Sequence, residues 1–132
     1  MTPSLSDLLQ QALSGDASVL DSLLAAPHAH LIEAARRVPR LHVGKHALLR
    51  ILSDWKRGAV SVSQVQRWAS FVKRGYGPQS AAEPVRPVDF VFDQASESLI
   101  VDVLGRLDEL GDTIDGTISQ EELNRMIERL EQ

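Results

Sequence analysis

The chain contains no cysteine, few aromatic residues and no long apolar run. Without cysteine it has no disulfide, no zinc–thiolate or iron–sulfur site and no thiol nucleophile. No apolar stretch approaches the roughly 18 residues of a membrane-spanning helix, so we expect no membrane span. The first residues also lack a basic region followed by an apolar core, so we expect no secretory signal and a cytoplasmic protein.

The chain has 132 residues, of which 43% are apolar and 24% charged. These values are ordinary for a globular protein and fit one domain over residues 1–132.

The net charge of −4 conceals three segments of different sign. Residues 1–35 carry four acids and no Lys or Arg. Residues 36–74 carry ten Lys or Arg against one acid, a local charge of +9, and residues 75–132 carry thirteen acids against four Arg, a local charge of −9. The basic middle and the acidic end can face each other in the fold, or they can be solvated faces without a partner, or one of them can be a surface for a partner.

Proline, glycine and capping residues divide the chain into segments with helical apolar periodicity. The predicted helices cover residues 2–13, 16–24, 27–38, 48–57, 61–73, 96–110 and 119–130, and the sixth of them can begin as early as Asp89. The longest loop is 75–88, with three Pro and two Gly. No segment supports a strand, and Val88–Phe92, which comes closest, is too short. We therefore predict an all-α antiparallel bundle of six to seven helices, with N-terminal helices over 1–45 and a two-hairpin bundle over 46–132.

Two capping boxes share one design at an offset of 58 residues. Ser61 with Gln64, and Ser119 with Glu122, can each satisfy two free backbone N–H groups at a helix start. Apolar residues also flank each cap at the positions of a hydrophobic staple. The chain is therefore expected to hold two helix–turn–helix hairpins, whether or not they arose by duplication.

All six aromatic residues lie between Trp55 and Phe92, on both sides of the long loop. Trp and Phe at helical spacing usually face a core, so we expect a packed aromatic cluster beneath this loop.

Several motifs for chemistry are absent or incomplete. The segment Asp115–Leu123 is similar to the second half of a calcium-binding EF-hand loop, but Gly111 and Thr113 occupy the leading ligand positions. His42 and His46 have helical spacing for a metal, but Gly44 lies between them and no acid is near. No nucleophile elbow, P-loop or dinucleotide-binding motif occurs. We expect no metal, no cofactor and no enzymatic activity.

The segment Val60–Gly75 resembles the recognition helix of bacterial helix-turn-helix regulators, and it lies inside the basic segment 36–74. In this alternative the protein binds nucleic acid. The base and phosphate readers would then be Gln64, Gln66, Arg67, Lys73 and Arg74.

The segments Ile51–Ala69 and Ile114–Leu130, about a quarter of the chain, resemble the colicin D-type bacterial immunity proteins. The resemblance implies a small helical, non-enzymatic inhibitor that binds a toxin, with acids occupying a basic nuclease cleft. The acidic residues implied are Asp108, Glu109, Asp112, Asp115, Glu121 and Glu122. Electrostatic attraction there would mainly raise the association rate and the specificity. A third reading is an oligomerising scaffold that forms a homodimer and binds no ligand.

Overall fold

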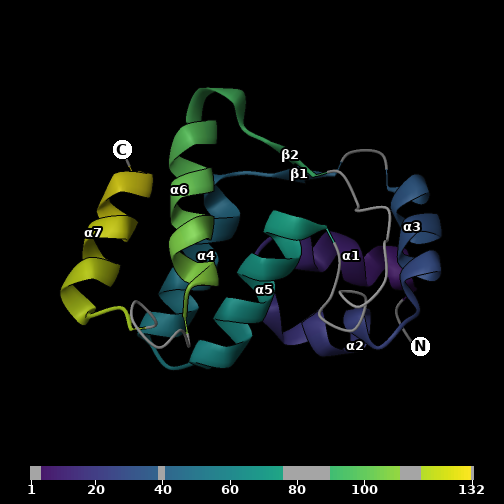
Figure 1. Ribbon diagram of the computed structural model, residues 1–132, viewed down its shortest axis with the longest axis horizontal. Coiled ribbons are helices and arrows are strands. Elements are labelled where there is room, and N and C mark those ends of the chain that lie inside the picture. The colour runs from purple at the N-terminus through teal and green to yellow at the C-terminus, as the bar shows by residue number, and fades with distance from the viewer. Residues whose placement is uncertain (1–3, 39–40, 76–89, 111–116, 132) are drawn as a thin grey trace.

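The computed structural model describes residues 4–38, 41–75, 90–110 and 117–131 (Figure 1). Within these ranges the chain forms seven α-helices, two short 3-10 helices and two very short strands. The α-helices are α1 (Leu5–Leu13), α2 (Leu20–Leu24), α3 (His28–Arg37), α4 (Lys45–Lys56), α5 (Val62–Arg74), α6 (Glu97–Asp108) and α7 (Gln120–Glu131). The predicted all-α class is confirmed. None of these helices is both long enough and apolar enough to cross a membrane.

The helix starts follow from the capping residues. At α5 the Ser61 hydroxyl accepts from the Gln64 backbone N–H at 3.1 Å, and the Gln64 side chain accepts from the Ser61 N–H at 2.8 Å. This is the complete capping box that the sequence predicts. Near the start of α7 the Ser119 hydroxyl accepts from the Glu122 N–H at 3.1 Å. The Glu122 carboxylate accepts hydrogen bonds from Arg106 instead, which joins this cap to α6.

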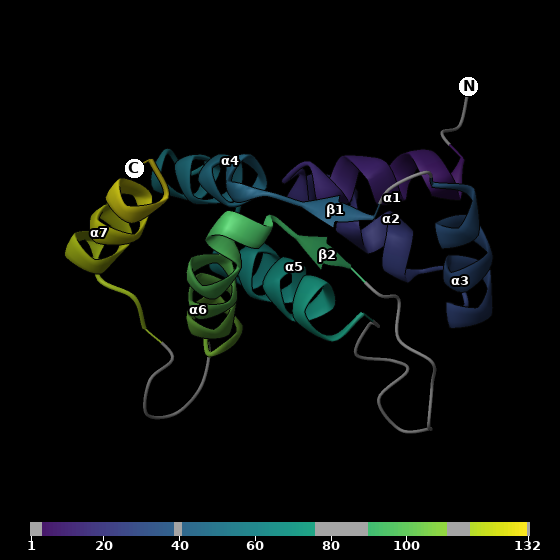
Figure 2. The ribbon, with the colours of Figure 1, turned by 90° about the horizontal axis from the view of Figure 1, so that it is seen from above.

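A parallel pair of two-residue strands was not predicted. β1 (His42–Val43) precedes α4 and β2 (Val91–Phe92) precedes α6. The Val91 N–H donates to the Leu41 carbonyl at 2.7 Å, and the His42 ring is bonded to the Asp93 carboxylate. Two residues are too few for an alternating pattern, so this pairing depends on contacts between distant segments. It brings the approaches to α4 and α6 side by side (Figures 1 and 2).

The helices pack mainly across the two hairpins rather than within them. α5 lies along α6, and α4 contacts α7, whereas the contacts between α4 and α5 and between α6 and α7 are less extensive. α1 packs against α2 and α3 at the opposite end of the molecule from α7 (Figure 2). The connection from α6 to α7 is also longer than the one from α4 to α5. The predicted hairpins are therefore present, but the core forms chiefly between them.

The core runs through the whole molecule and is centred on α5. Trp68 and Phe71 are among the largest fully buried side chains. The Trp68 indole donates to the Ala12 carbonyl at 2.7 Å, which connects α5 to the end of α1. Phe71 and Phe90 make an edge-to-face contact with ring centroids 5.4 Å apart. This is one aromatic pair of the cluster that the sequence predicts; Tyr76 and residues 76–88 of the loop lie outside the described residues.

Candidate binding surface and the groove between α6 and α7

The basic residues of α5 are bonded to carboxylates of neighbouring helices. Arg67 forms an ion pair with Asp21 of α2. Lys73 and Arg74 both reach Asp108 at the end of α6, at N···O distances of 3.4 and 3.0 Å. These contacts join residues that lie 34 to 46 positions apart in the chain. Part of the positive segment is therefore neutralised by acids from other segments.

Asp108 is the carboxylate on which these contacts converge. Its side chain is only 8% exposed, and it accepts from the Gln66 amide at 3.3 Å in addition to the two basic groups. Gln66 also donates to the Asp108 backbone carbonyl at 3.2 Å, near the C-terminus of α6. A shielded carboxylate with several donors is held in one geometry, and it offers little charge to a partner. Asp108, a candidate for binding a toxin, is therefore bonded to residues of α5 that are candidates for binding nucleic acid.

Other basic residues of the segment 36–74 are paired in the same way. Arg50 lies 3.9 Å from both Asp16 and Asp54, and Arg57 is bonded to Asp54. Arg36 contacts Glu33 one turn earlier on α3. Exposed pairs of this kind contribute little to stability individually. Their consequence here is electrostatic, because they reduce the positive potential that a nucleic acid would encounter.

All five candidates for nucleic-acid contact have partners within the fold. Gln64 belongs to the capping box, Gln66, Lys73 and Arg74 meet Asp108, and Arg67 meets Asp21. α5 itself lies in the middle of the molecule (Figures 1 and 2), with residues 68–72 buried. A recognition helix needs one exposed face along its length to enter the major groove.

Arg106 of α6 organises a second group of charges, the Arg106 cluster (Arg106, Glu109, Glu122 and the Thr117 carbonyl). Its guanidinium donates to both oxygens of Glu122, at 2.6 and 3.1 Å, and to Glu109 at 3.0 Å. It also donates to the Thr117 carbonyl at 2.8 Å. Such a bidentate contact uses the planar fork of the guanidinium. The cluster holds the end of α6 and the start of α7 together.

The pKa values of the two main partners shift in the directions expected for this bond. Hydrogen bonding to Arg106 lowers the pKa of Glu122 below its ordinary value, although partial burial acts in the opposite direction. The hydrogen bond to Glu122 raises the pKa of Arg106. Glu122 is therefore ionised at neutral pH, and its charge is balanced by Arg106.

The structure places the six acidic candidates in different surroundings. Asp108 is shielded, Glu109 and Glu122 belong to the Arg106 cluster, and Asp112 and Asp115 lie outside the described residues. Glu121 is exposed and forms no ion pair with any described residue. Of the four described candidates, Glu121 therefore presents its charge most directly to a partner.

Sequence reasoning missed other exposed acids on the same two helices. These are Glu97, Asp102, Glu128 and Glu131, none of which is paired with a described residue. For the acids on α7, the helical spacing of the apolar residues could have indicated which side of the helix is exposed. Leu123, Met126 and Leu130 are buried, and Glu121, Glu128 and Glu131 lie on the exposed side of the helix. With Glu121 they make five unpaired carboxylates on α6 and α7, against the two exposed guanidiniums of Arg125 and Arg129. We call these five carboxylates the acidic surface.

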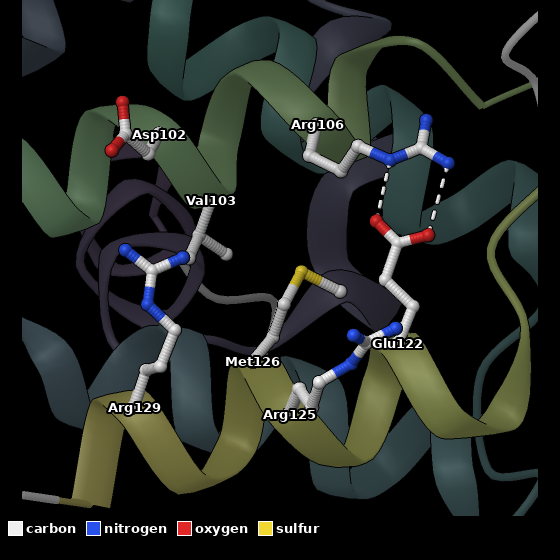
Figure 3. A pocket seen from close by; sticks show the side chains of 7 residues that line it. All are labelled: Asp102, Val103, Arg106, Glu122, Arg125, Met126 and Arg129. Carbon is white, nitrogen blue, oxygen red and sulfur yellow. Dashed lines mark hydrogen bonds and ion pairs between the residues drawn. The ribbon is translucent and has the colours of Figure 1, made fainter.

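A groove of about 400 Å³ lies between α6 and α7 (Figure 3). α6 contributes Asp102, Val103 and Arg106, and α7 contributes Glu122, Arg125, Met126 and Arg129. The bond between Arg106 and Glu122 closes one end of it, as Figure 3 shows. The sequence predicts that these two helices form a hairpin, but it did not identify the groove, because the groove depends on how their side chains pack against each other.

A smaller hollow of about 180 Å³ lies between α1 and α3, next to His30, Glu33 and Arg37. Among the described residues no group of three or more His, Asp or Glu is placed to hold a metal ion. His42 is bonded to Asp93, and His46 is exposed on α4.

No protein-family model, curated protein or solved structure matches this chain. The fold and the site together define an all-α protein with an acidic surface on its last two helices and an arginine-lined groove between them.

Proposed function

We propose that the protein is a non-enzymatic binding module whose acidic surface docks on a basic surface of another protein. Its partner is a bacterial toxin with a nuclease-like domain, and the module acts as an immunity-type inhibitor in the cytoplasm. The class of partner rests on the resemblance of two segments to colicin D-type immunity proteins. The choice of surface rests on the charges of the folded chain.

One observation carries the choice of surface. Four basic residues of the segment, Arg50, Arg67, Lys73 and Arg74, form ion pairs at the surface with carboxylates of other segments. The acidic surface keeps its five carboxylates in solvent. Surface charges that stay unpaired attract an oppositely charged partner over a distance of about 10 Å, the Debye length at moderate salt. The potential outside the protein at α6 and α7 therefore favours a basic partner.

The same observation weakens the nucleic-acid alternative. A helix that reads DNA needs free Arg, Lys and Gln side chains, whereas those of α5 are bonded to Asp21, Asp108 and Ser61. Binding to DNA would first have to break these contacts, and it would bring phosphates close to Asp108.

The first test is complex formation with the product of a neighbouring gene. If a toxin-like gene lies beside this one, the purified pair should form a one-to-one complex by light scattering. The protein alone should show no salt-dependent affinity for a 20-base-pair duplex. A gene without a toxin-like neighbour, or a neighbour whose product does not bind, would contradict the proposal. A homodimer with no complex would favour the scaffold reading.

The second test assigns the surface with a pair of variants. Glu121→Gln with Glu128→Gln removes two exposed charges that lie seven residues apart on one face of α7. The matched control is Asp7→Asn, which removes an exposed acid of α1 at the other end of the molecule. We expect the double variant to slow association with the partner about threefold or more and the control to leave it unchanged. Equal rates for both variants would place the interface elsewhere.

A further inference from the structure

We propose that the groove between α6 and α7 binds a free carboxylate attached to an apolar body. This inference does not rest on the proposed function, because it concerns a small ligand and the inner walls of the groove. It follows from three properties of the groove: two available guanidiniums, an apolar floor and a small surplus of positive charge.

The guanidiniums belong to Arg125 and Arg129, which lie one helical turn apart on α7 and therefore on the same side of it. Both side chains are exposed; Arg129 extends from α7 toward α6, and the Arg125 guanidinium lies beside Glu122 at the other end of the groove (Figure 3). Neither forms an ion pair in the part of the chain that the structure describes, although the charge of Arg125 helps to lower the pKa of Glu122. The guanidinium fork of Arg129 can donate two parallel hydrogen bonds to a planar carboxylate, and the positive charge of Arg125 on the same wall adds to the attraction.

The apolar floor consists of Val103 from α6 and Met126 from α7. These residues are 2% and 5% exposed, so they belong to the core and also line the groove. A volume of about 400 Å³ lies within the range of small-molecule pockets. Methionine adapts its shape to different apolar groups. The floor therefore favours a ligand with an apolar body rather than a bare inorganic anion.

The balance of charge selects the ionic state of the ligand. Outside the Arg106 cluster, the lining carries Arg125 and Arg129 against Asp102, one more positive charge than negative. Arg106 is already bonded to Glu122, Glu109 and the Thr117 carbonyl, so it serves as a fixed end wall. Asp102 on the opposite wall repels a second negative charge on a ligand (Figure 3). A carboxylate with a single charge satisfies this surplus, whereas a phosphate dianion exceeds it.

The test is a titration of the ¹⁵N-labelled protein followed by amide chemical shifts. The probes are phenylacetate, the neutral analogue phenylacetamide, and inorganic phosphate. We expect phenylacetate to shift amides of α6 and α7 with a dissociation constant on the order of 1 mM. Phenylacetamide and phosphate should each bind at least about tenfold more weakly. Equal binding of the amide, tighter binding of phosphate, or shifts confined to other helices would overturn the proposal.

Variants then assign the residues. Arg125→Gln with Arg129→Gln should weaken phenylacetate binding about tenfold or more, because both charge-assisted bonds are lost. Lys56→Gln is the matched control, since Lys56 is exposed on α4 and outside the groove. Asp102→Asn should tighten binding by about threefold, because it removes a repelling charge from the rim. The residues concerned are on the surface, and circular dichroism checks that each variant is folded. Unchanged affinity in the double arginine variant, or weaker binding in Asp102→Asn, would contradict the assignment.

Two further probes distinguish the source of the carboxylate. Acetyl-Gly-Leu presents the free C-terminus of a polypeptide on an apolar residue, and its amidated form lacks the charge. If the free peptide binds more tightly than phenylacetate, the natural ligand is the end of a protein chain. If it binds more weakly, the natural ligand is a small apolar acid. Binding of the amidated peptide as tightly as the free one would overturn the proposal.

Discussion

The close approach of α1 and α4 gives a sharp test of the packing. Gly15, just after α1, has a φ of +98°, and a Cβ atom built there would lie 2.5 Å from the Ala47 carbonyl oxygen. It would also lie 3.1 Å from the Ala47 carbonyl carbon and Cα. These are backbone atoms of α4, which cannot move aside as the end of a flexible side chain can. Gly15→Ala must therefore either strain this contact or separate the two helices.

The expected loss in the free energy of unfolding of Gly15→Ala has two parts. A side chain in the left-handed region costs about 1 to 2 kcal/mol, and overpacking a tight contact costs about 1 to 3 kcal/mol more. We therefore expect Gly15→Ala to lower the free energy of unfolding by about 2 to 5 kcal/mol. Since a domain of this size has a total of about 5 to 15 kcal/mol, the loss is a large fraction of it.

Gly58 supplies the matched control. Its φ of +79° is similar, but a Cβ atom at Gly58 would meet nothing within 4 Å. Gly58→Ala should therefore cost only the conformational part, about 1 to 2 kcal/mol. Urea denaturation followed by tryptophan fluorescence and circular dichroism measures both variants. Equal losses for the two variants would refute the reasoning, because they would mean that α1 and α4 do not approach this closely.

Three other measurements test separate parts of the structure. Gly105→Ala on α6 has open space around the new Cβ and should raise the free energy of unfolding by about 0.5 to 1 kcal/mol in the same urea assay. Trp68→Phe loses the buried hydrogen bond to the Ala12 carbonyl and should lower the midpoint of thermal unfolding, with a cost of about 1 to 3 kcal/mol. The bond to Arg106 lowers the folded-state pKa of Glu122. The ionised carboxylate therefore adds its full contribution to the free energy of unfolding at pH values above the ordinary glutamate pKa of about 4.3. That contribution is lost as pH falls through the lower folded value, so the stability difference between the protein and Glu122→Gln, measured by urea denaturation from pH 6 to pH 3, should shrink. A difference in the free energy of unfolding between these two proteins that does not change with pH would refute this last expectation.

The helices were predictable because their signals are local. Ser61 and Gln64 lie three residues apart, and their two hydrogen bonds form wherever that turn becomes helical. The buried stripe of α7 likewise follows from the spacing of Leu123, Met126 and Leu130. In each case the residues that make the interaction are neighbours in the sequence.

The strands and the pairing of helices were not predictable, because they depend on residues far apart in the chain. His42 and Asp93 are 51 positions apart, and neither belongs to a pattern that points to the other. The candidate surface shows the same limit. The sequence separated a basic middle from an acidic end, but only the fold shows that Asp108 is held by Lys73 and Arg74 while Glu121 stays in solvent.

The most direct test of the proposed docking surface is the salt dependence of association with the toxin-like partner. Stopped-flow mixing at several ionic strengths measures the association rate constant for the protein and for the Glu121→Gln, Glu128→Gln double variant. We predict a rate constant that falls steeply with salt, and a shallower dependence in the double variant, because the acidic surface steers the encounter. Identical salt dependence of the two proteins would contradict the claim that these exposed carboxylates face the partner.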